Sequence, residues 1–304
     1  MLDSTPAAVG IDVGGTKTCL RAVTGTDCVA DHVRPSRGWR PHDPASAAAW
    51  LAALVGEVLP AHTVPAAVAV GAHACETPRQ CEGIRLALQE RLQVPCLIVG
   101  DAELLVPAAG LGQGVGLVAG TGSVAVGRLP DGTSVQVGGW GAVLGDEGGG
   151  AGLVREAARA VWAAHDRGEA PGALAHRLVA AFGVGEVPAL GGALESATEV
   201  SADWGRHAPV VFEAAEEGSV LAHRVITDGG RALASLVGRL ASRGVAVDDV
   251  VVAGSTILRR PALYSAFATA LADSVPAARP RPLQVPPVEG AVALARSLLR
   301  PVTP

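Results

Sequence analysis

The fold is decided by the stretch Val9-Gly10-Ile11-Asp12-Val13-Gly14-Gly15-Thr16-Lys17-Thr18. The apolar residues before its paired glycines, and the apolar run that follows, predict a strand, a tight turn and a second strand. Glycine tolerates positive φ and lets backbone N–H groups approach an anion closely. Asp12 falls at the end of the first strand, where a carboxylate can hold a water on Mg²⁺. No helix follows the turn, which excludes Rossmann and P-loop motifs. An ordinary hairpin with a stray aspartate is the alternative.

A second stretch repeats this pattern in the middle of the chain. It reads Gly116-Leu117-Val118-Ala119-Gly120-Thr121-Gly122-Ser123-Val124-Ala125-Val126-Gly127, and a third strand is predicted at 134–137. The two copies indicate an internal duplication. Successive N–H groups of Gly120-Thr121-Gly122, with the hydroxyls of Thr121 and Ser123, can donate to phosphate oxygens. One such hairpin in each of two domains predicts that a polyphosphate is bound from both sides. The alternative is that the second turn is only a glycine-rich bend between two strands.

Composition narrows the class of protein. With 304 residues the chain is long enough for two domains, and 49% hydrophobic against 17% charged residues is typical of a compact globular protein. The net charge is −5, Lys17 is the single lysine and no Lys/Arg run occurs. A nucleic-acid or anionic-membrane partner is therefore not expected.

The cysteines predict a reducing compartment. Their odd number, wide spacing and lack of any CxxC pair argue against disulfides or a zinc site. The chain contains Cys19, Cys28, Cys75, Cys81 and Cys96. No signal peptide is expected at the N-terminus, and the uncharged stretch 104–127 holds Pro107 and several glycines, which favours a helix end, turn and strand over a membrane span. We expect a cytoplasmic protein.

Strands alternate with helices after each hairpin, which predicts an α/β protein with mixed sheets. The further predicted strands are 29–33, 66–70, 96–99 and 247–253, and the predicted helices are 45–59 (capped by Asp43 or Ser46), 82–92, 153–165, one within 171–182, 222–242, 261–271 and 290–299. The region 187–204 is expected to form two short helices broken by Gly191-Gly192. Residues 276–287 are rich in proline and are expected to form a linker.

Two further places carry acidic residues that suit catalysis. Asp101 follows the strand 96–99 where a helix begins, at the edge of the sheet where α/β proteins bind ligands. It is interpreted as a helix cap, a general base, or both. In the segment 138–150, Asp146 and Glu147 stand between glycines, which favours contact with sugar hydroxyls or hydrated Mg²⁺ over a flexible surface loop. The histidines, His73 among them, show no metal-ligand spacing.

The motifs GIDVGGTKT, GDAE, GLVAGTGSVAVG, GGWGAVLGDEG and VVVAGS, in this order, resemble the N-acetylglucosamine kinase branch of the BadF/BadG/BcrA/BcrD ATPase family. The resemblance covers nearly the whole chain and implies the actin/Hsp70/sugar-kinase fold: two lobes of duplicated ribonuclease H-like domains around a central cleft. The implied lobes are 1–109 with the C-terminal helix 290–304, and 110–289. ATP and Mg²⁺ are the implied cofactors, a sugar is the implied substrate, and a homodimer is expected.

The resemblance also implies roles for single residues. Asp12 would hold Mg²⁺ through water, and Asp101 would deprotonate the acceptor hydroxyl. The implied nucleotide-binding residues are Gly14, Gly15, Thr16, Lys17, Gly120, Thr121, Gly122, Ser123, Gly254 and Ser255. The implied sugar-binding residues are Ser36, Arg37, Trp39, Asp101, Gly139, Trp140, Asp146 and Glu147.

Departures from the family pattern fall on the sugar side. The loop 35–39 lacks the usual asparagine, His73 stands where an aspartate is frequent, and Gly149 replaces a serine. Arg37 would favour an amino sugar with an anionic group, or point to solvent. The expected function is ATP-dependent phosphorylation of a sugar hydroxyl, first of all the 6-OH of N-acetylglucosamine or a related amino sugar.

Two other functions are weighed against a kinase. An ATP-driven activator of a 2-hydroxyacyl-CoA dehydratase type enzyme needs paired cysteines for an iron–sulfur cluster, and Cys75 and Cys81 are the only close pair. A non-catalytic nucleotide or sugar sensor is the second alternative. Glucokinases with a zinc-binding cysteine cluster are excluded by the cysteine spacing.

Overall fold

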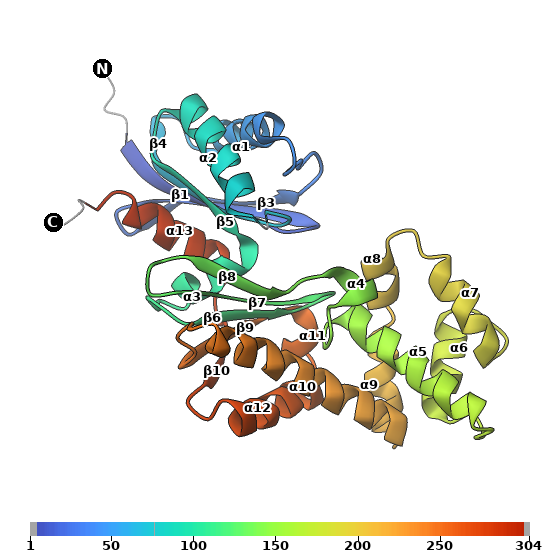
Figure 1. The fold of residues 1–304 in the computed structure, drawn as a ribbon. Coiled ribbons are helices and arrows are strands. Elements are labelled where there is room, and N and C mark those ends of the chain that lie inside the picture. The colour runs from blue at the N-terminus through green and yellow to red at the C-terminus, as the bar shows by residue number, and fades with distance from the viewer. Residues whose placement is uncertain (1–4, 76, 301–304) are drawn as a thin grey trace. The chain divides into compact units, whose positions relative to one another are not determined.

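The computed structural model describes residues 5–75 and 77–300 and divides into two compact units (Figure 1). Unit 1 runs to Gln113 and resumes at Leu283, and unit 2 spans Gly114–Pro282. The C-terminal helix thus belongs to the unit that begins the chain. The lobe boundaries expected from the sequence, at residues 110 and 289, stay predictions about domains.

Unit 1 is built on a mixed five-stranded sheet. Its elements are β1 (Thr5–Val13), β2 (Lys17–Thr24), β3 (Asp27–Pro35), α1 (Pro44–Val58), β4 (Thr63–Ala72), α2 (Pro78–Leu92), β5 (Cys96–Gly100), the 3₁₀ turn η1 (Asp101–Leu104), α3 (Leu105–Ala108) and α13 (Val288–Ser297). The strand order is β3-β2-β1-β4-β5. β1, β2 and β3 pair antiparallel, whereas β4 and β5 run parallel to β1. The predicted opening hairpin and mixed sheet are confirmed, and the strand expected at 29–33 is part of the longer β3.

Alternation along β1 places the sheet between two helical layers. Val9 and Ile11 are buried in a core shared with α1 and α2, including Leu51 and Leu88. Successive side chains of a strand point to opposite faces, so Gly10 faces the other way. A Cβ on Gly10 would lie 2.4 Å from the backbone nitrogen of Val292 in α13, so the glycine lets this helix approach the strand closely.

Unit 2 repeats the sheet of unit 1. Its elements are β6 (Val115–Ala119), β7 (Ser123–Arg128), β8 (Ser134–Gly138), α4 (Gly141–Leu144), α5 (Gly150–Asp166), α6 (Ala173–Ala181), the 3₁₀ turn η2 (Val187–Ala189), α7 (Leu190–Glu195), α8 (Val200–Gly205), α9 (Pro209–Glu216), α10 (Val220–Ser242), β9 (Asp249–Ala253), α11 (Ser255–Leu258), α12 (Pro261–Ser274) and β10 (Arg279–Pro282). The order β8-β7-β6-β9-β10 has the same antiparallel hairpin, meander and parallel pairs as the order of unit 1. The internal duplication predicted from the sequence is confirmed.

The core of unit 2 joins the sheet to helices α10 and α12. Leu117 and Ala125 of the sheet are buried with Leu233 of α10 and Phe267 of α12. α10 and α12 pack closely, because a Cβ on Gly230 would lie 2.6 Å from the backbone of Phe267. The helix predicted at 222–242 is confirmed as α10.

Two local predictions in unit 2 are wrong. Gly191-Gly192 do not break a helix, since α7 runs through both, and the interruption lies at Ser196–Glu199. Packing overrides propensity here: a Cβ on Gly191 would lie 3.6 Å from the ring of Trp162, whose Nε1 donates to the Val187 carbonyl at 3.1 Å.

The proline-rich segment is also more than a linker. It contains β10, which pairs parallel with β9 at the edge of the sheet. Proline is compatible with an edge strand because its missing N–H can face away from the ladder. An ion pair of 2.7 Å between Arg281 and Asp249 joins the two strands.

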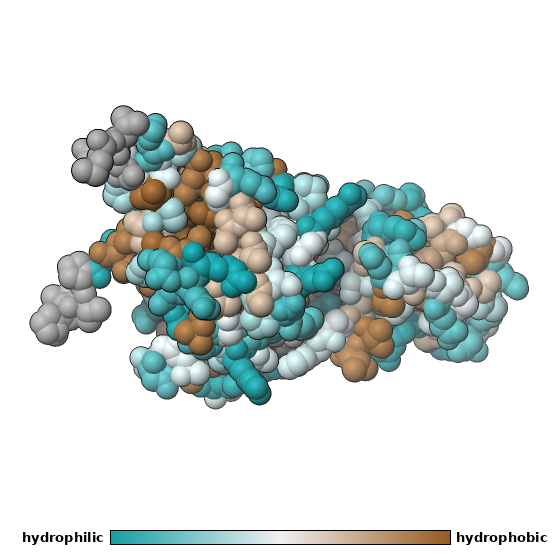
Figure 2. Space-filling view, turned by 90° about the horizontal axis from the view of Figure 1, so that it is seen from above, coloured by the Kyte–Doolittle hydropathy of each residue, from teal (hydrophilic) through white to brown (hydrophobic). Residues whose placement is uncertain are grey.

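The surface is mixed in polarity. Figure 2 shows hydrophobic side chains in patches between hydrophilic ones on one face of the molecule. Over residues 5–75 and 77–300, no helix has the length and apolar character that a membrane crossing requires.

Candidate active site

Three parallel strands of unit 1 end at one edge of its sheet and place two aspartates and a histidine there. Asp12 precedes the last residue of β1, His73 follows β4, and Asp101 follows β5. Ligands of open α/β sheets bind at this carboxyl edge. The sequence foresaw Asp12 and Asp101 here, whereas His73 was set aside as a residue without ligand spacing.

Asp101 begins the turn η1 without capping it. The N-cap position is Gly100, and its N–H donates to Oε1 of Glu103 at 3.2 Å. Oδ1 of Asp101 accepts from the N–H of Ala102 at 2.8 Å. The expectation that Asp101 is the helix cap is therefore wrong, and its half-exposed carboxylate lies directly after the end of β5.

The first turn, Gly14 to Lys17, presents backbone donors. Gly14 N–H donates to the Lys17 carbonyl at 3.0 Å, which closes the turn. Gly15, Thr16 and Lys17 are exposed, and the N–H groups of Gly15 and Thr16 have no acceptor among the described residues. Two successive free N–H groups form a concavity that suits an anion such as a phosphate oxygen.

Ser36 supports this turn. Its hydroxyl donates to the Gly14 carbonyl at 2.7 Å and lies 2.9 Å from the Thr18 hydroxyl, and its N–H donates to the Thr16 carbonyl at 3.0 Å. The hydroxyl that the sequence assigned to sugar binding is thus engaged with the turn.

Two tryptophans fix the loop 35–39 through hydrogen bonds from their indole N–H groups. Trp39 Nε1 donates to the His73 carbonyl at 3.0 Å, and its ring lies 5.8 Å from that of Trp50. Trp50 Nε1 donates to the Arg37 carbonyl at 3.1 Å, while Arg37 itself is exposed. The loop is therefore anchored beside the strand ends, with Arg37 on the surface.

Asp12 lies in an unusual electrostatic environment. Burial, and secondly the negative charge of Asp101, raise the pKa of Asp12 to about 7, and Lys17 opposes this shift. A bound divalent cation would favour the ionised carboxylate. No group of three or more metal-ligating side chains occurs among the described residues. One or two carboxylates fit Mg²⁺, which keeps several waters and is bound largely through substrate phosphates.

The second turn, Gly120 to Ser123, is embedded in unit 2. Gly120 N–H donates to the Gly122 carbonyl at 3.0 Å, and the N–H groups of Thr121 and Gly122 have no acceptor among the described residues. The carbonyls of Gly120 and Thr121 accept from Gly150 and Ala151, at 2.8 and 2.9 Å, at the start of α5. Both turns thus offer two successive N–H groups, and the second is fixed to a helix.

The Ser123 hydroxyl is already engaged within unit 2. It is buried and donates to the Glu147 carbonyl at 2.8 Å. Thr121, in contrast, is exposed. Of the two hydroxyls expected to donate to phosphate, Thr121 alone is available in this arrangement.

The acidic residues of the glycine-rich segment point in different directions. Asp146 is buried with φ of 58°, and its Oδ1 accepts from the N–H of Ser123 at 3.3 Å. Burial raises the pKa of Asp146, and hydrogen bonds from the backbone of Ser123 and Gly141 oppose the shift. Glu147 is exposed. Asp146 is therefore in contact with the second turn, and Glu147 is the more accessible acid.

The glycines of this segment allow close packing around the turn. A Cβ on Gly149 would lie 2.6 Å from the carbonyl carbon of Gly122, and one on Gly152 would lie 2.2 Å from the Asp146 carbonyl oxygen. Gly139 N–H donates to the Ser123 carbonyl at 2.9 Å. Trp140, next in the chain, has 71% of its surface exposed.

The segment after β9 also reaches the second turn. Gly254 has φ of 107°, and a Cβ there would lie 2.4 Å from the Ala119 carbonyl. The Thr256 hydroxyl donates to the Gly120 carbonyl at 2.7 Å, and Ser255 is exposed. The sequence analysis did not predict a role for Thr256, although its hydroxyl directly follows the Gly254-Ser255 motif.

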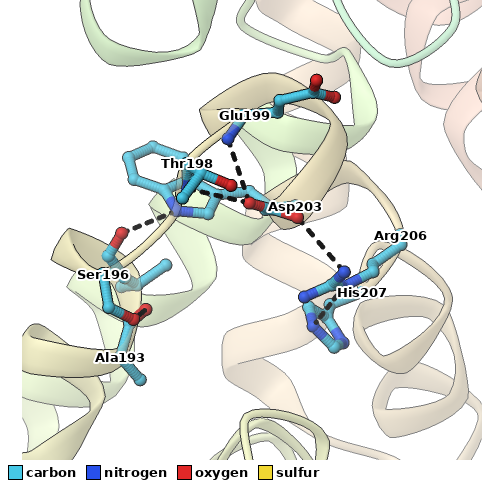
Figure 3. A network of polar contacts seen from close by, with 9 residues as sticks. Ala193, Ser196, Thr198, Glu199, Asp203, Arg206 and His207 are labelled. Atoms are coloured by element: carbon cyan, nitrogen blue, oxygen red, sulfur yellow. Dashed lines mark hydrogen bonds and ion pairs between the residues drawn. The ribbon is translucent and has the colours of Figure 1, made fainter.

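A short helix covers the other side of the turn. A Cβ on Gly205, the last residue of α8, would lie 2.9 Å from Cγ2 of Thr121. The start of α8 is fixed by Asp203, which accepts from the N–H groups of Thr198 and Glu199 at 3.0 and 3.1 Å (Figure 3). Asp203 also pairs with Arg206 at 3.1 Å. The sequence did not predict this network, because its residues come together only when the segment between α7 and α8 folds.

The chain belongs to the BadF/BadG/BcrA/BcrD ATPase family, whose model matches residues 100–295. Its two sheets have the actin-like fold of the sugar kinases, as comparison with solved structures shows. A candidate N-acetylglucosamine kinase from Chromobacterium violaceum has 23% identity and a TM-score of 0.70, over 96% of this chain and 99% of that chain. A ROK family glucokinase from Streptomyces griseus, in complex with glucose and AMPPNP, has 18% identity and a TM-score of 0.55, over 96% and 98%.

One curated relative is similar over a short stretch. The N-acetylmuramic acid/N-acetylglucosamine kinase of Clostridium acetobutylicum is 40% identical over 76 residues. This match spans 24% of this chain and 24% of that relative, so about a quarter of each protein is compared.

Proposed function

We propose that the protein transfers the γ-phosphoryl group of ATP to a sugar hydroxyl, most of all the 6-OH of N-acetylglucosamine or a related amino sugar. One observation carries the proposal. The free N–H groups of Gly15 and Thr16, the Asp12 carboxylate and the half-exposed Asp101 carboxylate all lie at the carboxyl edge of the unit 1 sheet. A phosphate-binding turn beside a base is what transfer to an alcohol requires.

The proposed reaction assigns each group one task. Asp101 accepts the proton of the acceptor hydroxyl, the hydroxyl oxygen forms a bond to the γ-phosphorus, and the bond from that phosphorus to the β,γ-bridging oxygen breaks, so that ADP leaves. The turns Gly14–Lys17 and Gly120–Ser123 each donate backbone N–H groups to ATP phosphates. Mg²⁺ held beside Asp12 would neutralise phosphate charge. Gly254 and Ser255 are proposed to contact the adenosine.

The sugar side rests on fewer contacts. The proposed sugar-binding residues are Arg37, Trp39, Trp140 and Glu147. Ser36 and Asp146 are proposed to support sugar phosphorylation at least indirectly, because each makes a hydrogen bond to one of the two glycine turns. The relative from Clostridium acetobutylicum and the structure from Chromobacterium violaceum support an amino sugar as acceptor. A homodimer and a cytoplasmic location stay predictions.

A coupled ADP-release assay tests the proposal. The purified chain is incubated with MgATP and, in separate reactions, N-acetylglucosamine, N-acetylmuramic acid, glucosamine, glucose or buffer. We expect ADP release that depends on an amino sugar, and a product that is a 6-phosphate by ³¹P NMR. ATP binding without turnover on any sugar would contradict a kinase and favour the nucleotide or sugar sensor.

The activator alternative fits the cysteines poorly. Cys75 is buried, and Cys81 Sγ donates to the Cys75 carbonyl at 3.7 Å, so this pair faces the inside of unit 1. An iron–sulfur cluster shared between two copies needs thiolates at a surface. A brown, iron-containing preparation would reverse this judgement.

A further inference from the structure

The backbone of His73 is fixed between two parts of the candidate site. Its N–H donates to the Val13 carbonyl at the end of β1, at 2.8 Å, and its carbonyl accepts from Trp39 Nε1 at 3.0 Å. His73 is the first residue after β4, between the strand ends that carry Asp12 and Asp101. The imidazole is therefore placed at the carboxyl edge by the sheet itself.

The imidazole lies between the base and the phosphate-binding turn. Its Nδ1 is 3.7 Å from Oδ2 of Asp101, and its Nε2 is 3.6 Å from the position of a Cβ on Gly15. The side chains of His73 and Asp101 are 57% and 41% exposed. A polar contact this exposed contributes little to stability, so a role in holding the fold does not explain the arrangement.

The charges around Asp101 explain why a second contact to its carboxylate would help to orient it. The negative charges of Asp12 and Asp101 repel each other. The positive charge of Lys17 has the opposite effect on Asp12 and lowers its pKa. Oδ1 of Asp101 is held by the Ala102 N–H at 2.8 Å, which leaves Oδ2 facing His73. Oδ1 is thus held by a hydrogen bond, and Oδ2 is the oxygen that lies nearest to His73.

We infer that His73 is a positioning residue for Asp101: its Nδ1–H holds Oδ2 so that the carboxylate faces the acceptor hydroxyl. This inference rests on the proposed kinase function. At 3.7 Å the pair is longer than a hydrogen bond, and contacts of catalytic groups commonly tighten only when substrate is bound. Loss of a group that aligns a base lowers the rate of the chemical step more than substrate binding.

Two amide substitutions separate the contacts of the two ring nitrogens. In His73→Asn the amide nitrogen takes the place of Nδ1, whereas in His73→Gln it reaches the place of Nε2. We expect His73→Ala and His73→Gln to lower kcat by about 10- to 100-fold, with KM for ATP and sugar within about twofold of wild type. We expect His73→Asn to keep most of the wild-type kcat. His32→Ala, at an exposed histidine on β3, is the matched control and should not change kcat.

A readout independent of turnover separates this inference from the kinase proposal. We expect the ring ¹⁵N signals of His73 to shift in Asp101→Asn and to stay in place in the control Asp27→Asn, because Asp27 is the first residue of β3. Unchanged signals in Asp101→Asn would overturn the contact, even in an active enzyme. Equal kcat for His73→Ala and wild type, equal losses for Asn and Ala, or a change confined to KM for ATP would overturn the positioning role. Shifted signals with an inactive wild type would refute the kinase proposal, and the catalytic role with it.

Discussion

The two glycine turns belong to sheets of the same strand order, yet they are held in opposite ways. The Gly14–Lys17 turn is exposed and is supported from one side by Ser36. The Gly120–Ser123 turn is enclosed by the start of α5, by Asp146 and by Thr256. Duplication has therefore preserved the hairpin and its free N–H groups, while the supports diverged. The acidic residues that suit chemistry stand beside the open turn, in Asp12 and Asp101.

The largest expected effect is at Asp101, the residue that distinguishes the open turn chemically. Asp101→Asn keeps the shape of the side chain and its acceptor toward Ala102, but removes the basic carboxylate. We expect kcat for sugar phosphorylation to fall by about 10²–10⁴-fold, with an unchanged melting temperature. Steady-state kinetics and thermal unfolding measure both. A rate within threefold of wild type would exclude Asp101 as the base.

Glycine substitutions test whether the second turn is the rigid one. In Gly149→Ala the new Cβ would meet the backbone of Gly122 at 2.6 Å, and backbone cannot rotate away. We expect a loss of about 1–3 kcal/mol of stability, seen as a lower melting temperature. Gly120→Ala has no atom within 4 Å of its Cβ, and Gly15→Ala has only the His73 ring at 3.6 Å. Both should unfold like wild type, and equal destabilisation of all three would contradict the comparison.

One hydrogen bond supports each turn through a hydroxyl, so a matched pair of variants compares them. Thr256→Val removes the donor to Gly120, and Ser36→Ala removes the donor to Gly14. Each should cost about 0.5–1.5 kcal/mol. We expect Ser36→Ala to raise KM for ATP more, because the open turn has fewer other supports. Chemical denaturation and ATP titration measure these effects, and a larger rise for Thr256→Val would reverse the order.

The smallest effect expected is a pH dependence from Asp146. Burial raises its pKa in the folded state above the ordinary 3.8, so the folded protein binds the proton more tightly than the unfolded chain. The resulting stabilisation is complete below pH 3.8 and is lost as pH rises through the raised pKa. The free energy of unfolding of wild type should therefore fall relative to that of Asp146→Asn over this window. Urea unfolding at several pH values measures the difference, and a constant or opposite slope would contradict it.

Local pattern was sufficient for part of the structure. The turns of Gly14–Lys17 and Gly120–Ser123, the duplication and the position of Asp101 after β5 follow from apolar runs and paired glycines, which are local signals. The placement of His73 depends on β4 lying between β1 and β5, which a linear sequence does not state.

Packing decided the features that the sequence reading missed. The close approach of backbone to backbone around Asp146, at Gly149 and Gly152, could not be predicted from the glycine-rich motif alone. Gly191 stays helical beside the ring of Trp162, which lies 3.6 Å from the position of a Cβ on Gly191. The strand β10 forms because Arg281 and its neighbours pair with β9. In each case the partner lies far along the chain.

The most direct test of the account follows the γ-phosphate itself. ATP labelled at the γ-phosphate is mixed with the wild-type protein, Mg²⁺ and N-acetylglucosamine, and the label is traced in a single turnover. We predict that the label appears in a sugar 6-phosphate at the rate at which ATP disappears, and that Asp101→Asn slows this transfer by about 10²–10⁴-fold while still binding ATP. Label released as free phosphate, or equal transfer by Asp101→Asn, would contradict the account.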